Sequence, residues 1–421
     1  MMDLILDSRE NRHHQIQSIV SNPKHVVLII KANTVGLDKN TREAYCLVRI
    51  FKNHISQYIR FTSLQLNESY DGPYYIGIID SSDSTVIKRK TIEIEEQHPL
   101  GRLIDLDVYD RGGPLSRSNL AFSPRTCFLC GDIAFHCIKS RKHPEVETMD
   151  YVRHITMEFI TQSLQSIIKK AMELELNLEH KFGLVTKSSS GSHSDMNYRL
   201  MHSTIDVLIP FFIQLFELGY QNELNLVDSA RTIGRLAENE MFKHTNGINC
   251  YKGLIFVLGA TLVAVGQVLS NKQTFSMINQ TMKEIFHSVI NDFKENLNTH
   301  GTNVYDKYGL LGARGEVING LPSVQAIYDL LKRVDETDEN SLRNILVKLI
   351  LLCEDTTFLT RSGSWEKYLF IKDEFKSLDA DNLQDVIRFS NKCILEGLSF
   401  GGAADLLITA LCLKQIEATF F

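Results

Sequence analysis

The sequence lacks an excess of basic residues: its 45 lysines and arginines are outnumbered by 51 aspartates and glutamates, and the formal net charge is -6 at pH 7. Proteins that bind nucleic acids or anionic membrane surfaces in a general way carry a basic excess. We therefore expect neither nucleic acid nor a membrane as a partner. A local basic pocket for a small-molecule nucleotide remains compatible with this charge.

The sequence also lacks a recognisable secretory leader, because its first ten residues carry acid early and their apolar run is too short. The longest uncharged apolar segment, 253–270, approaches the roughly 20 residues of a membrane span. It contains three glycines and Gln267 and has no basic flank, so we expect a buried core helix there. The eight cysteines are scattered except for one cluster. Without a leader, they predict reduced thiols in a cytoplasmic protein.

No low-complexity linker and no obvious internal repeat divides the chain, although 421 residues exceed one ordinary core. The boundary is instead a change of hydrophobic period near residue 155. Before it, strand-like runs occupy 25–31, 74–80, 91–95 and 103–109. After it, helical stripes recur at 160–172, 200–219, 223–242, 252–270, 274–298, 322–333, 339–353 and 381–397. We predict an α+β domain over 1–155 followed by an all-α helical-bundle domain over 156–421.

Two aspartates lie on one face of a predicted strand. Residues 103–109 alternate strictly, so Asp105 and Asp107 point to one side and the apolar residues to the other. Paired carboxylates can bind a hard divalent cation such as Mg²⁺, although the same pattern is common on solvated strand edges. Gly101 allows close approach of a phosphate, and Ser116, Arg117 and Arg125 supply anion donors. This context favours a metal–phosphate site.

A cluster of thiols and imidazoles follows: Cys127, Cys130, His136, Cys137 and His143. The spacing is permitted for structural zinc. However, apolar residues separate the first two thiols, and a helical face continues after them. We therefore favour core thiols and little stoichiometric zinc, with zinc binding or redox chemistry as alternatives.

Four polar, glycine-bearing motifs interrupt the helical half: 183–196, 238–253, 312–316 and 399–407. Each alone is compatible with a loop or a helix cap. Because all four combine glycine with an ionisable group, together they predict a convergent polar pocket in the bundle.

The N-terminal pattern resembles the apo-citrate lyase phosphoribosyl-dephospho-CoA transferase family. The motifs that carry this resemblance are Gly101-Arg-Leu-x-Asp-x-Asp-Val-Tyr-Asp, Leu115-Ser-Arg117, Arg125-x-Cys-x-x-Cys130, Ala134, Cys137, His143, Arg9-Glu10-x-Arg12 and Asn33-x-x-Gly36-x-x-Lys39. The resemblance implies a nucleotidyltransferase-like domain with Asp105 and Asp107 as catalytic metal ligands. It implies that Arg9, Arg12, Lys39, Arg117 and Arg125 bind phosphate. One departure is Val35, where the family usually has proline.

The four C-terminal motifs resemble triphosphoribosyl-dephospho-CoA synthase, which joins ATP to 3′-dephospho-CoA and expels adenine. Glycosyl transfer must stabilise an oxocarbenium-like ribose and deprotonate the incoming hydroxyl, and carboxylates do both. We expect Asp195 and Glu238 to act as the catalytic carboxylates, with Asp405 third. Substrate and phosphate contacts are expected from His193, Asn249, Lys252, Arg314, Glu316, Gly401 and Gly402. Cys250, Tyr251 and Phe400 depart from the family's usual residues.

Together these resemblances imply a bifunctional transferase that uses ATP and 3′-dephospho-CoA, with Mg²⁺, to make the citrate lyase prosthetic-group precursor. It would then transfer this precursor to a serine of the acyl carrier protein and release pyrophosphate. Its macromolecular partner would be the citrate lyase acyl carrier protein. Two alternatives stay open. The first is the equivalent malonate decarboxylase enzymes, which the segment at 125–130 disfavours. The second is an inactive assembly factor, which the intact Asp105, Asp107, His193, Asp195 and Arg314 disfavour.

Overall fold

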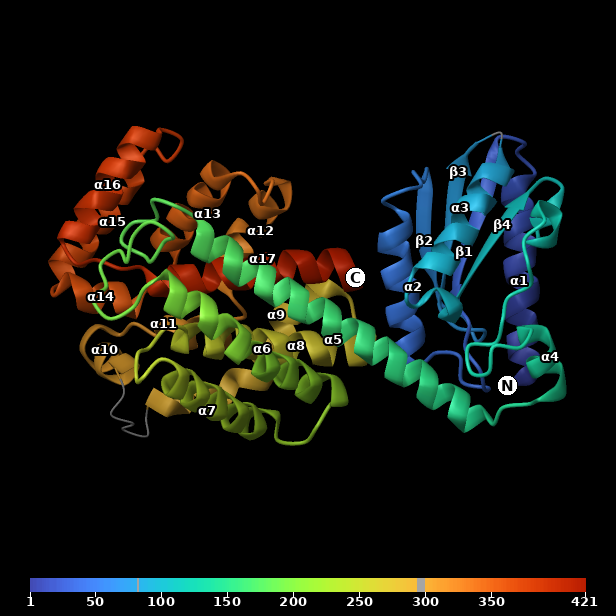
Figure 1. Cartoon of the computed structure of the whole chain (residues 1–421), viewed down its shortest axis with the longest axis horizontal. Coiled ribbons are helices and arrows are strands. Elements are labelled where there is room, and N and C mark those ends of the chain that lie inside the picture. Colours follow the sequence, from blue (N-terminus) through green and yellow to red (C-terminus); the bar gives the residue numbers. More distant parts are fainter. Residues whose placement is uncertain (82, 294–299) are drawn as a thin grey trace. The chain divides into compact units, whose positions relative to one another are not determined.

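The computed structural model describes residues 1–81, 83–293 and 300–421 and divides into two compact units (Figure 1). Unit 1 comprises Met1–Ser163 with Ala418–Phe421, and unit 2 comprises Leu164–Glu417. In the described residues, every strand lies in unit 1, before residue 116, and unit 2 is built from helices. The fold is thus mixed α+β with a large helical part. The expected boundary near 155 lies inside one continuous helix, α5 (Glu145–Asn177).

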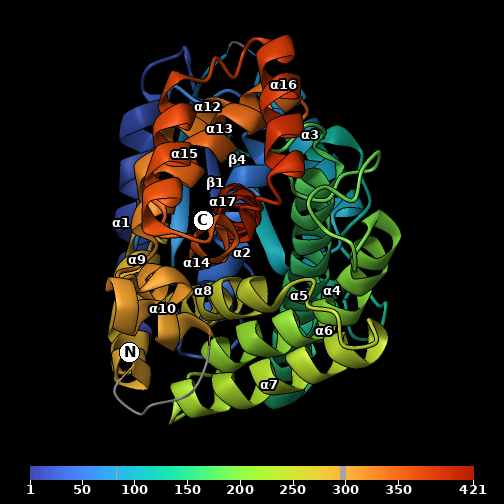
Figure 2. The same ribbon diagram turned by 90° about the vertical axis from the view of Figure 1, so that its left-hand side faces the viewer.

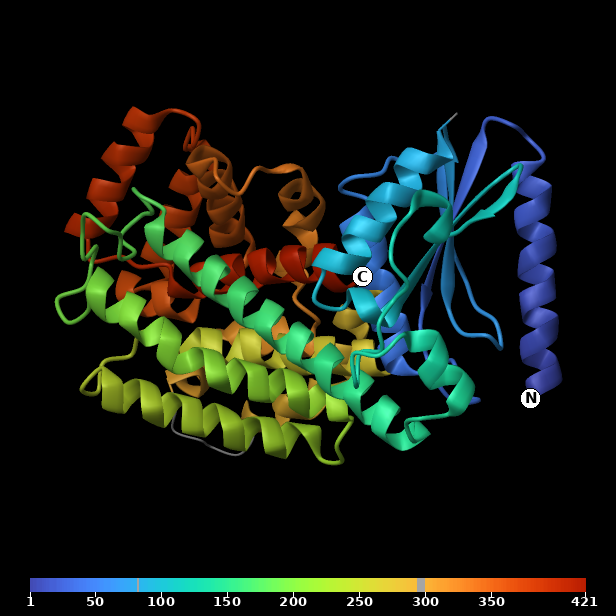
Figure 3. The same ribbon diagram turned by 45° about the vertical axis from the view of Figure 1, so that its right-hand side comes forward.

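Unit 1 contains a five-stranded sheet in the order β2-β3-β1-β4-β5, with each neighbouring pair antiparallel. The strands are β1 (His25–Ala32), β2 (Ser63–Asn67), β3 (Tyr74–Asp80), β4 (Ile104–Asp110) and β5 (Gly113–Leu115). Helix α1 (Met2–Val20) covers one face, and α2 (Arg42–Ile55) and α3 (Ser84–Gln97) cover the other (Figure 3). The short helix α4 (Ala134–Ser140) follows the strands. The sheet positions the residues of the predicted metal–phosphate site.

The strand predicted at 91–95 is wrong, because these residues belong to α3. The Asp83 side chain accepts hydrogen bonds from the backbone N–H groups of Thr85 and Val86, which starts a helix there. The isoleucines and threonine at 87, 91, 92 and 94 then fall on a buried helical face. The apparent strand alternation at 91–95 is a short part of that helical stripe.

Unit 2 contains helices at almost all the predicted stripes. They are α6 (Tyr198–Gln221), α7 (Leu226–His244), α8 (Lys252–Ser270), α9 (Ile278–Phe286), α10 (His300–Tyr308), α11 (Gly312–Ile318), α12 (Pro322–Arg333), α13 (Glu339–Leu352), α14 (Thr356–Ser362), α15 (Trp365–Ser377), α16 (Leu383–Leu395) and α17 (Gly401–Phe420). The stripe predicted at 274–298 is split: α9 is followed by a 3-10 segment, His287–Phe293, and 294–298 lie outside the described residues.

Helix α8 is the predicted core helix. Two helices, α6 and α8, are long and apolar enough to cross a membrane by composition, but 78% of the apolar window of α8 is buried inside the protein. Helices α6, α7 and α8 pack together (Figure 2). A Cβ at Gly219 would meet the Val263 carbonyl oxygen at 2.0 Å, and one at Gly266 would meet the Phe216 carbonyl oxygen at 2.2 Å. These two glycines therefore allow the backbones of α6 and α8 to touch.

Candidate functional sites

In unit 1, helix α1 divides one sheet face into an apolar end and a polar end. Ile16 and Val20 of α1 pack with Val27, Ile29 and Tyr74 in a buried cluster. One and two turns earlier on α1, Arg12 and Arg9 extend past this cluster toward the other end of the face. The helix thus packs on the sheet with its last turns and presents cations from its middle turns.

Asp71 is the centre of the polar end, and its side chain is only 1% exposed. It accepts hydrogen bonds from Arg9 Nε at 3.0 Å and Arg12 NH2 at 2.9 Å, and its carboxylate lies 3.5 Å from Lys31 Nζ. Burial opposes ionisation of Asp71, yet Lys31 and Arg12 hold its pKa below the usual value. Lys39 is close enough to this carboxylate to feel the charge of Asp71. Burial lowers the pKa of Lys39, and Asp71 opposes that shift. Four cations therefore surround one buried anion, a concentration of positive charge suited to phosphate.

Asp105 and Asp107 lie on the same face of β4, as predicted. In the antiparallel register Asp105 pairs with Lys31 and Asp107 with Ile29. Asp105 forms an ion pair with Arg125. Asp107 remains accessible to solvent along this face, yet the protein packed around its carboxylate and then the charge of Asp105 raise its pKa. A positive charge between these two carboxylates would relieve that repulsion.

The pair fits the predicted Mg²⁺ in its donor chemistry, because Mg²⁺ prefers oxygen ligands and is bound through one or two carboxylates plus phosphate oxygens. Asp107 has no ion pair with the described residues, whereas Asp105 is partly neutralised by Arg125. Asp107 is accordingly the carboxylate with more capacity for a cation.

Arg117 and Arg125 converge on Glu95, a carboxylate of α3 that is only 1% exposed. Glu95 Oε1 also accepts a hydrogen bond from the Leu106 backbone N–H at 3.0 Å, in the part of β4 that does not pair with β5. Burial raises the Glu95 pKa, and the two arginines oppose that shift. Arg117 therefore serves a buried carboxylate in this structure, whereas Arg125 connects that carboxylate to Asp105.

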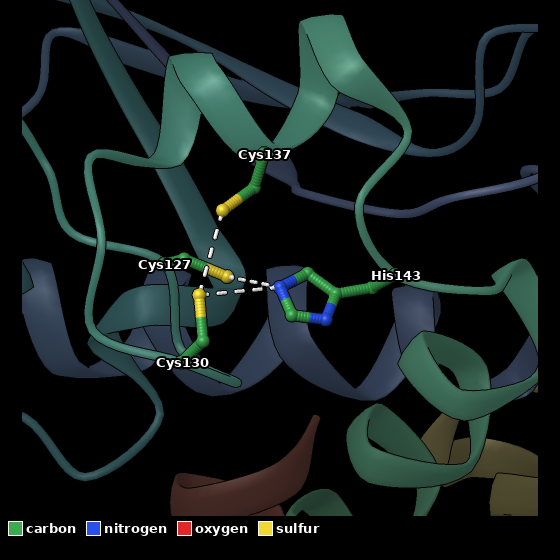
Figure 4. Close-up of side chains that lie close together, drawn as sticks. All are labelled: Cys127, Cys130, Cys137 and His143. Carbon is green, nitrogen blue, oxygen red and sulfur yellow. Dashed lines mark hydrogen bonds between the residues drawn. The ribbon is translucent and has the colours of Figure 1, made fainter.

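The expectation of core thiols is wrong for Cys127 and Cys130, because Cys127 is half-buried and Cys130 is exposed. Only Cys137 of this group is buried. All three thiols converge with His143 (Figure 4). His136, also part of the sequence cluster, does not join the group and is exposed.

Unit 2 contains a cavity of about 200 Å³ to which all four polar motifs contribute. From the motifs, its lining includes His193, Met196, Asn249, Cys250, Tyr251, Lys252, Gly253, Gly312, Ala313, Glu316, Ser399, Gly401, Gly402, Ala404 and Asp405. The convergent pocket that the sequence predicts is therefore present. Glu175, Lys181, Glu354 and Asp355 line it as well.

His193 ties the first motif to the fourth. Its Nδ1 lies 3.0 Å from Arg361 NH2, and its Nε2 lies 3.0 Å from Ser399 Oγ. Because a guanidinium only donates hydrogen bonds, Nδ1 accepts, and the neutral ring carries its proton on Nε2 and donates it to Ser399. Burial and then the Arg361 charge lower the pKa of His193 to about 4. His193 is thus a neutral donor that orders the wall of the cavity.

Asp405 lies where α17 meets the start of α8. A Cβ at Gly253 would lie 2.1 Å from Asp405 Oδ2, so only glycine allows this approach. Burial, and then the charges of Asp355 and Glu175, raise the Asp405 pKa well above its usual value. No described residue donates a hydrogen bond to its carboxylate. Asp405 is therefore a carboxylate inclined to hold a proton and open to a ligand.

Asp355 has a structural contribution at the same wall. Its Oδ1 accepts from the Phe358 backbone N–H at 2.9 Å and its Oδ2 from the Ala403 backbone N–H at 3.2 Å. These bonds join the first turns of α14 and α17. They offset part of the effect of burial, which raises the Asp355 pKa.

A buried ion pair forms another part of the wall. Lys181 Nζ lies 2.6 Å from Glu175 Oε1, and both side chains are almost fully buried. Burial lowers the Lys181 pKa, and Glu175 opposes the shift. The Tyr251 hydroxyl is buried at the same cavity and has no hydrogen-bond partner among the described residues. It is a donor that a bound molecule can satisfy.

The other predicted residues of unit 2 lie outside the lining or serve neighbouring groups. Glu238 forms an ion pair with Lys252 at 2.9 Å, and the exposed Asp195 acts electrostatically on His193 and Cys250. Arg314 lies 3.4 Å from Asp292. Asp195, Glu238 and Arg314 are therefore not lining residues, although Lys252 links Glu238 to the cavity.

Comparison with known proteins assigns both halves of the chain. The CitX family, apo-citrate lyase phosphoribosyl-dephospho-CoA transferase, matches residues 1–159. The CitG family, ATP:dephospho-CoA triphosphoribosyl transferase, matches residues 161–420. "Protein CitXG" of Leuconostoc mesenteroides subsp. cremoris is 30% identical, covering 98% of this chain and 96% of its own. The chain belongs to the CitX–CitG fusion family.

Further relatives agree with membership of the CitX–CitG fusion family. "Protein CitXG" of Haemophilus influenzae is 29% identical over 96% of this chain and 94% of its own. A 2-(5''-triphosphoribosyl)-3'-dephosphocoenzyme-A synthase of Haemophilus ducreyi is 29% identical and covers 66% of this chain and 96% of its own. The chain is a bifunctional transferase of citrate lyase prosthetic-group synthesis.

Sequence reasoning missed several residues of both sites in this CitX–CitG fusion. In unit 1, Asp71 was visible only as part of a turn before Gly72-Pro73, and Lys31 only as the end of a strand. In unit 2, Glu354 and Asp355 follow directly after the apolar stripe at 339–353. That acidic pair at a helix end was the available signal.

Proposed function

We propose that unit 2 makes 2′-(5″-triphosphoribosyl)-3′-dephospho-CoA and that unit 1 transfers it to a serine of the citrate lyase acyl carrier protein. In the first reaction, the bond between adenine and ribose C1′ of ATP breaks, and the 2′-hydroxyl oxygen of 3′-dephospho-CoA bonds to C1′. In the second, the serine oxygen attacks the α-phosphorus and pyrophosphate leaves. The meeting of all four polar motifs at one cavity, within the CitG match, carries this proposal.

In unit 2, Asp405 is the residue best placed to accept the proton of the incoming hydroxyl. Its raised pKa favours proton uptake, and no described donor occupies its carboxylate. The neutral His193 orders the loop before Gly401 and Gly402 through Ser399. Lys252 would bind the triphosphate. Asn249 would hold the first turn of α8, because its side chain accepts a hydrogen bond from the Lys252 backbone N–H at 3.1 Å.

The other predicted residues of unit 2 retain proposed roles nearer the edge of the cavity. Glu238 and Asp195 would stabilise positive charge that develops on the ribose or orient Lys252. Arg314 would reach the triphosphate only by leaving Asp292. Glu316 is held by Ser323, whose backbone N–H donates to it at 3.2 Å, so its contribution is to shape the lining.

In unit 1, Arg9, Arg12, Lys31 and Lys39 are the proposed phosphate-binding cations. Asp71 holds three of these side chains in one place, and its burial keeps them oriented. Asp105 and Asp107 lie beside them on β4 and would hold Mg²⁺. When bound, Mg²⁺ supplies positive charge to the pyrophosphate leaving group. The nucleotidyltransferase-like domain and the helical-bundle domain, over 1–155 and 156–421, are part of this proposal.

The test separates the two reactions in the intact chain. ATP, 3′-dephospho-CoA, Mg²⁺ and the citrate lyase acyl carrier protein are mixed with the enzyme, adenine is followed by chromatography, and carrier mass is followed by mass spectrometry. We expect Asp107→Asn to release adenine at the wild-type rate but to leave the carrier unmodified. Normal carrier modification by both Asp107→Asn and Asp105→Asn would contradict the unit 1 assignment.

A further inference from the structure

Three sulfur atoms and one imidazole nitrogen converge in unit 1. The donor atoms of Cys127, Cys130, Cys137 and His143 all lie within 4.8 Å of one another (Figure 4). His143 Nε2 is 3.4 Å from Cys127 Sγ and 3.3 Å from Cys130 Sγ, and the sulfurs of Cys130 and Cys137 are 3.5 Å apart. None of these thiols forms a disulfide. Four donors thus surround one small space.

The backbone builds this arrangement from three local pieces. Residues 127–131 form a tight turn in which the Gly131 N–H donates to the Cys127 carbonyl at 3.0 Å, and an isolated bridge joins Thr126 to Ile133. Cys137 then lies on α4. That helix ends at Arg141, whose left-handed conformation turns the chain so that His143 returns to the thiols. Turn, helix and return all direct their donors inward.

The segment has little else to hold it together. Between residues 116 and 144, only Cys137 is buried. Some of its large apolar residues face solvent, with Phe135 65% exposed and Ile138 72% exposed. A short segment that buries so little apolar surface needs a disulfide or a metal to fix its shape. The observed donor geometry fits the second of these.

We propose that Cys127, Cys130, Cys137 and His143 bind one structural Zn²⁺ ion. Three sulfurs and one nitrogen in tetrahedral arrangement are a donor set that zinc prefers, and four protein ligands leave no open position for catalysis. Binding converts the three thiols to thiolates and releases three protons, so the site carries one net negative charge. Lys142 Nζ lies 3.5 Å from Cys130 Sγ and 2.6 Å from Asp132 Oδ2, so it is shared with Asp132 and offsets part of that charge.

The site also stabilises a residue of the transfer site. Arg125 precedes the first ligand by two positions, and its carbonyl accepts a hydrogen bond from the Ala134 N–H at 2.9 Å. The Arg125 guanidinium in turn pairs with Asp105 and Glu95. Bound zinc therefore fixes the position of the segment from which the Arg125 side chain reaches β4. Its loss should weaken transfer to the carrier without affecting adenine release in unit 2.

Metal content measured on the intact chain tests the site directly, independently of either activity. We expect about one zinc per chain by elemental analysis after purification without chelators. Cys130→Ser and His143→Ala should lower this content strongly, whereas His136→Ala, which changes a neighbouring exposed imidazole, should leave it unchanged. Far-UV circular dichroism and thermal unfolding report whether each variant is folded, because adenine release depends on unit 2 alone.

Cobalt substitution supplies a second readout that does not need a ligand variant. Zinc is removed from the wild-type chain under reducing conditions and Co²⁺ is added. Thiolate-to-cobalt charge-transfer bands with the intense visible bands of a tetrahedral site are expected. The proposal would be overturned if the zinc-free wild-type protein showed no binding of Co²⁺ at these four residues. A disulfide between Cys130 and Cys137 in the active enzyme would also overturn it.

Discussion

At the residue scale, the environment of Asp405 lowers the stability of the fold but favours the proton uptake that the reaction needs. Its carboxylate is placed beside Asp355 and Glu175 in a site that raises its pKa well above the usual value. At a pH between the pKa of Asp405 in the unfolded chain and its pKa in the folded protein, the folded protein binds a proton that the unfolded chain does not. Stability therefore falls as pH rises through that window, and the loss is complete above the folded pKa. A group that destabilises the fold is retained where a proton must be taken up.

Asp405→Asn should consequently raise the melting temperature at neutral pH while reducing adenine release about 100-fold or more, the usual size of a general-base contribution. The gain in stability should vanish at acidic pH, where both side chains are uncharged. Thermal unfolding between acidic and neutral pH, with adenine release measured in parallel, checks both effects. Asp329→Asn, on the exposed face of α12, is the matched control. A variant with full activity would remove Asp405 from the mechanism.

Lys252 and Asn249 are neighbours in the second motif with separable effects. Lys252 is about half exposed and pairs with Glu238, so its ion pair contributes little to stability, on the order of 0–1 kcal/mol. Lys252→Ala should raise the KM for ATP roughly tenfold, equivalent to about 1.4 kcal/mol of binding, with little change in melting temperature. Asn249→Ala removes a hydrogen bond to the first turn of α8 and should cost about 1 kcal/mol of stability. If Lys252→Ala instead lowers the melting temperature and leaves the KM for ATP unchanged, Lys252 only stabilises the first turn of α8.

The residue types in the motifs predicted that the motifs converge, but not which other side chains would join them at each site. Gly401, Gly402 and Asp405 were visible because they belong to one of four motifs that each combine glycine with an ionisable group. Asp71 and Glu175 were not, because a buried carboxylate that pairs with a cation differs from a surface one only in its surroundings. Those partners are distant in sequence, as Arg9 and Asp71 show.

At the element scale, the first turn of α8 and the first turn of α17 must approach closely, and Gly253 sets that distance. A Cβ there would collide with the Asp405 carboxylate. In contrast, a Cβ at Gly234, inside α7, would meet nothing within 4 Å. The same substitution thus has opposite consequences at two helical glycines.

Gly253→Ala should lower the rate of adenine release strongly by displacing Asp405, even though alanine favours the helix. Gly234→Ala should raise stability by about 0.5–1 kcal/mol and leave both activities unchanged, because it gains helix propensity without a clash. Rates of adenine release and melting temperatures for both variants make the comparison. Equal activity of the two variants would show that Asp405 is free to move without consequence.

The elements themselves were predictable where a periodic pattern was long. The stripe at 252–270 became α8 with the predicted burial, because every face of that helix is covered. The short run at 91–95 failed, since five alternating residues fit either a strand or part of a helical stripe, and the Asp83 cap decided between them. The change of period near 155 fell within α5, where a single helix continues across the change.

At the scale of the whole molecule, each candidate site is built from one unit. The cations around Asp71 and the carboxylates of β4 all precede Ser163, and the cavity residues from Glu175 to Asp405 all follow it. Among the residues that the structure describes, those named for each site come from one unit. Damage to one set of residues should therefore leave the other reaction intact.

A mixture of two full-length variants tests this independence. Asp107→Asn should retain synthesis, and Asp405→Asn should retain transfer, so neither alone should modify the carrier from ATP and 3′-dephospho-CoA. Mixed together, they should restore modification, because the intermediate made by one chain can diffuse to the other, at a rate that rises with enzyme concentration. The control is Asp405→Asn supplied with separately prepared 2′-(5″-triphosphoribosyl)-3′-dephospho-CoA, which should modify the carrier by itself. If that control succeeds while the mixture fails, the intermediate does not pass between chains, and the two sites are coupled within each molecule.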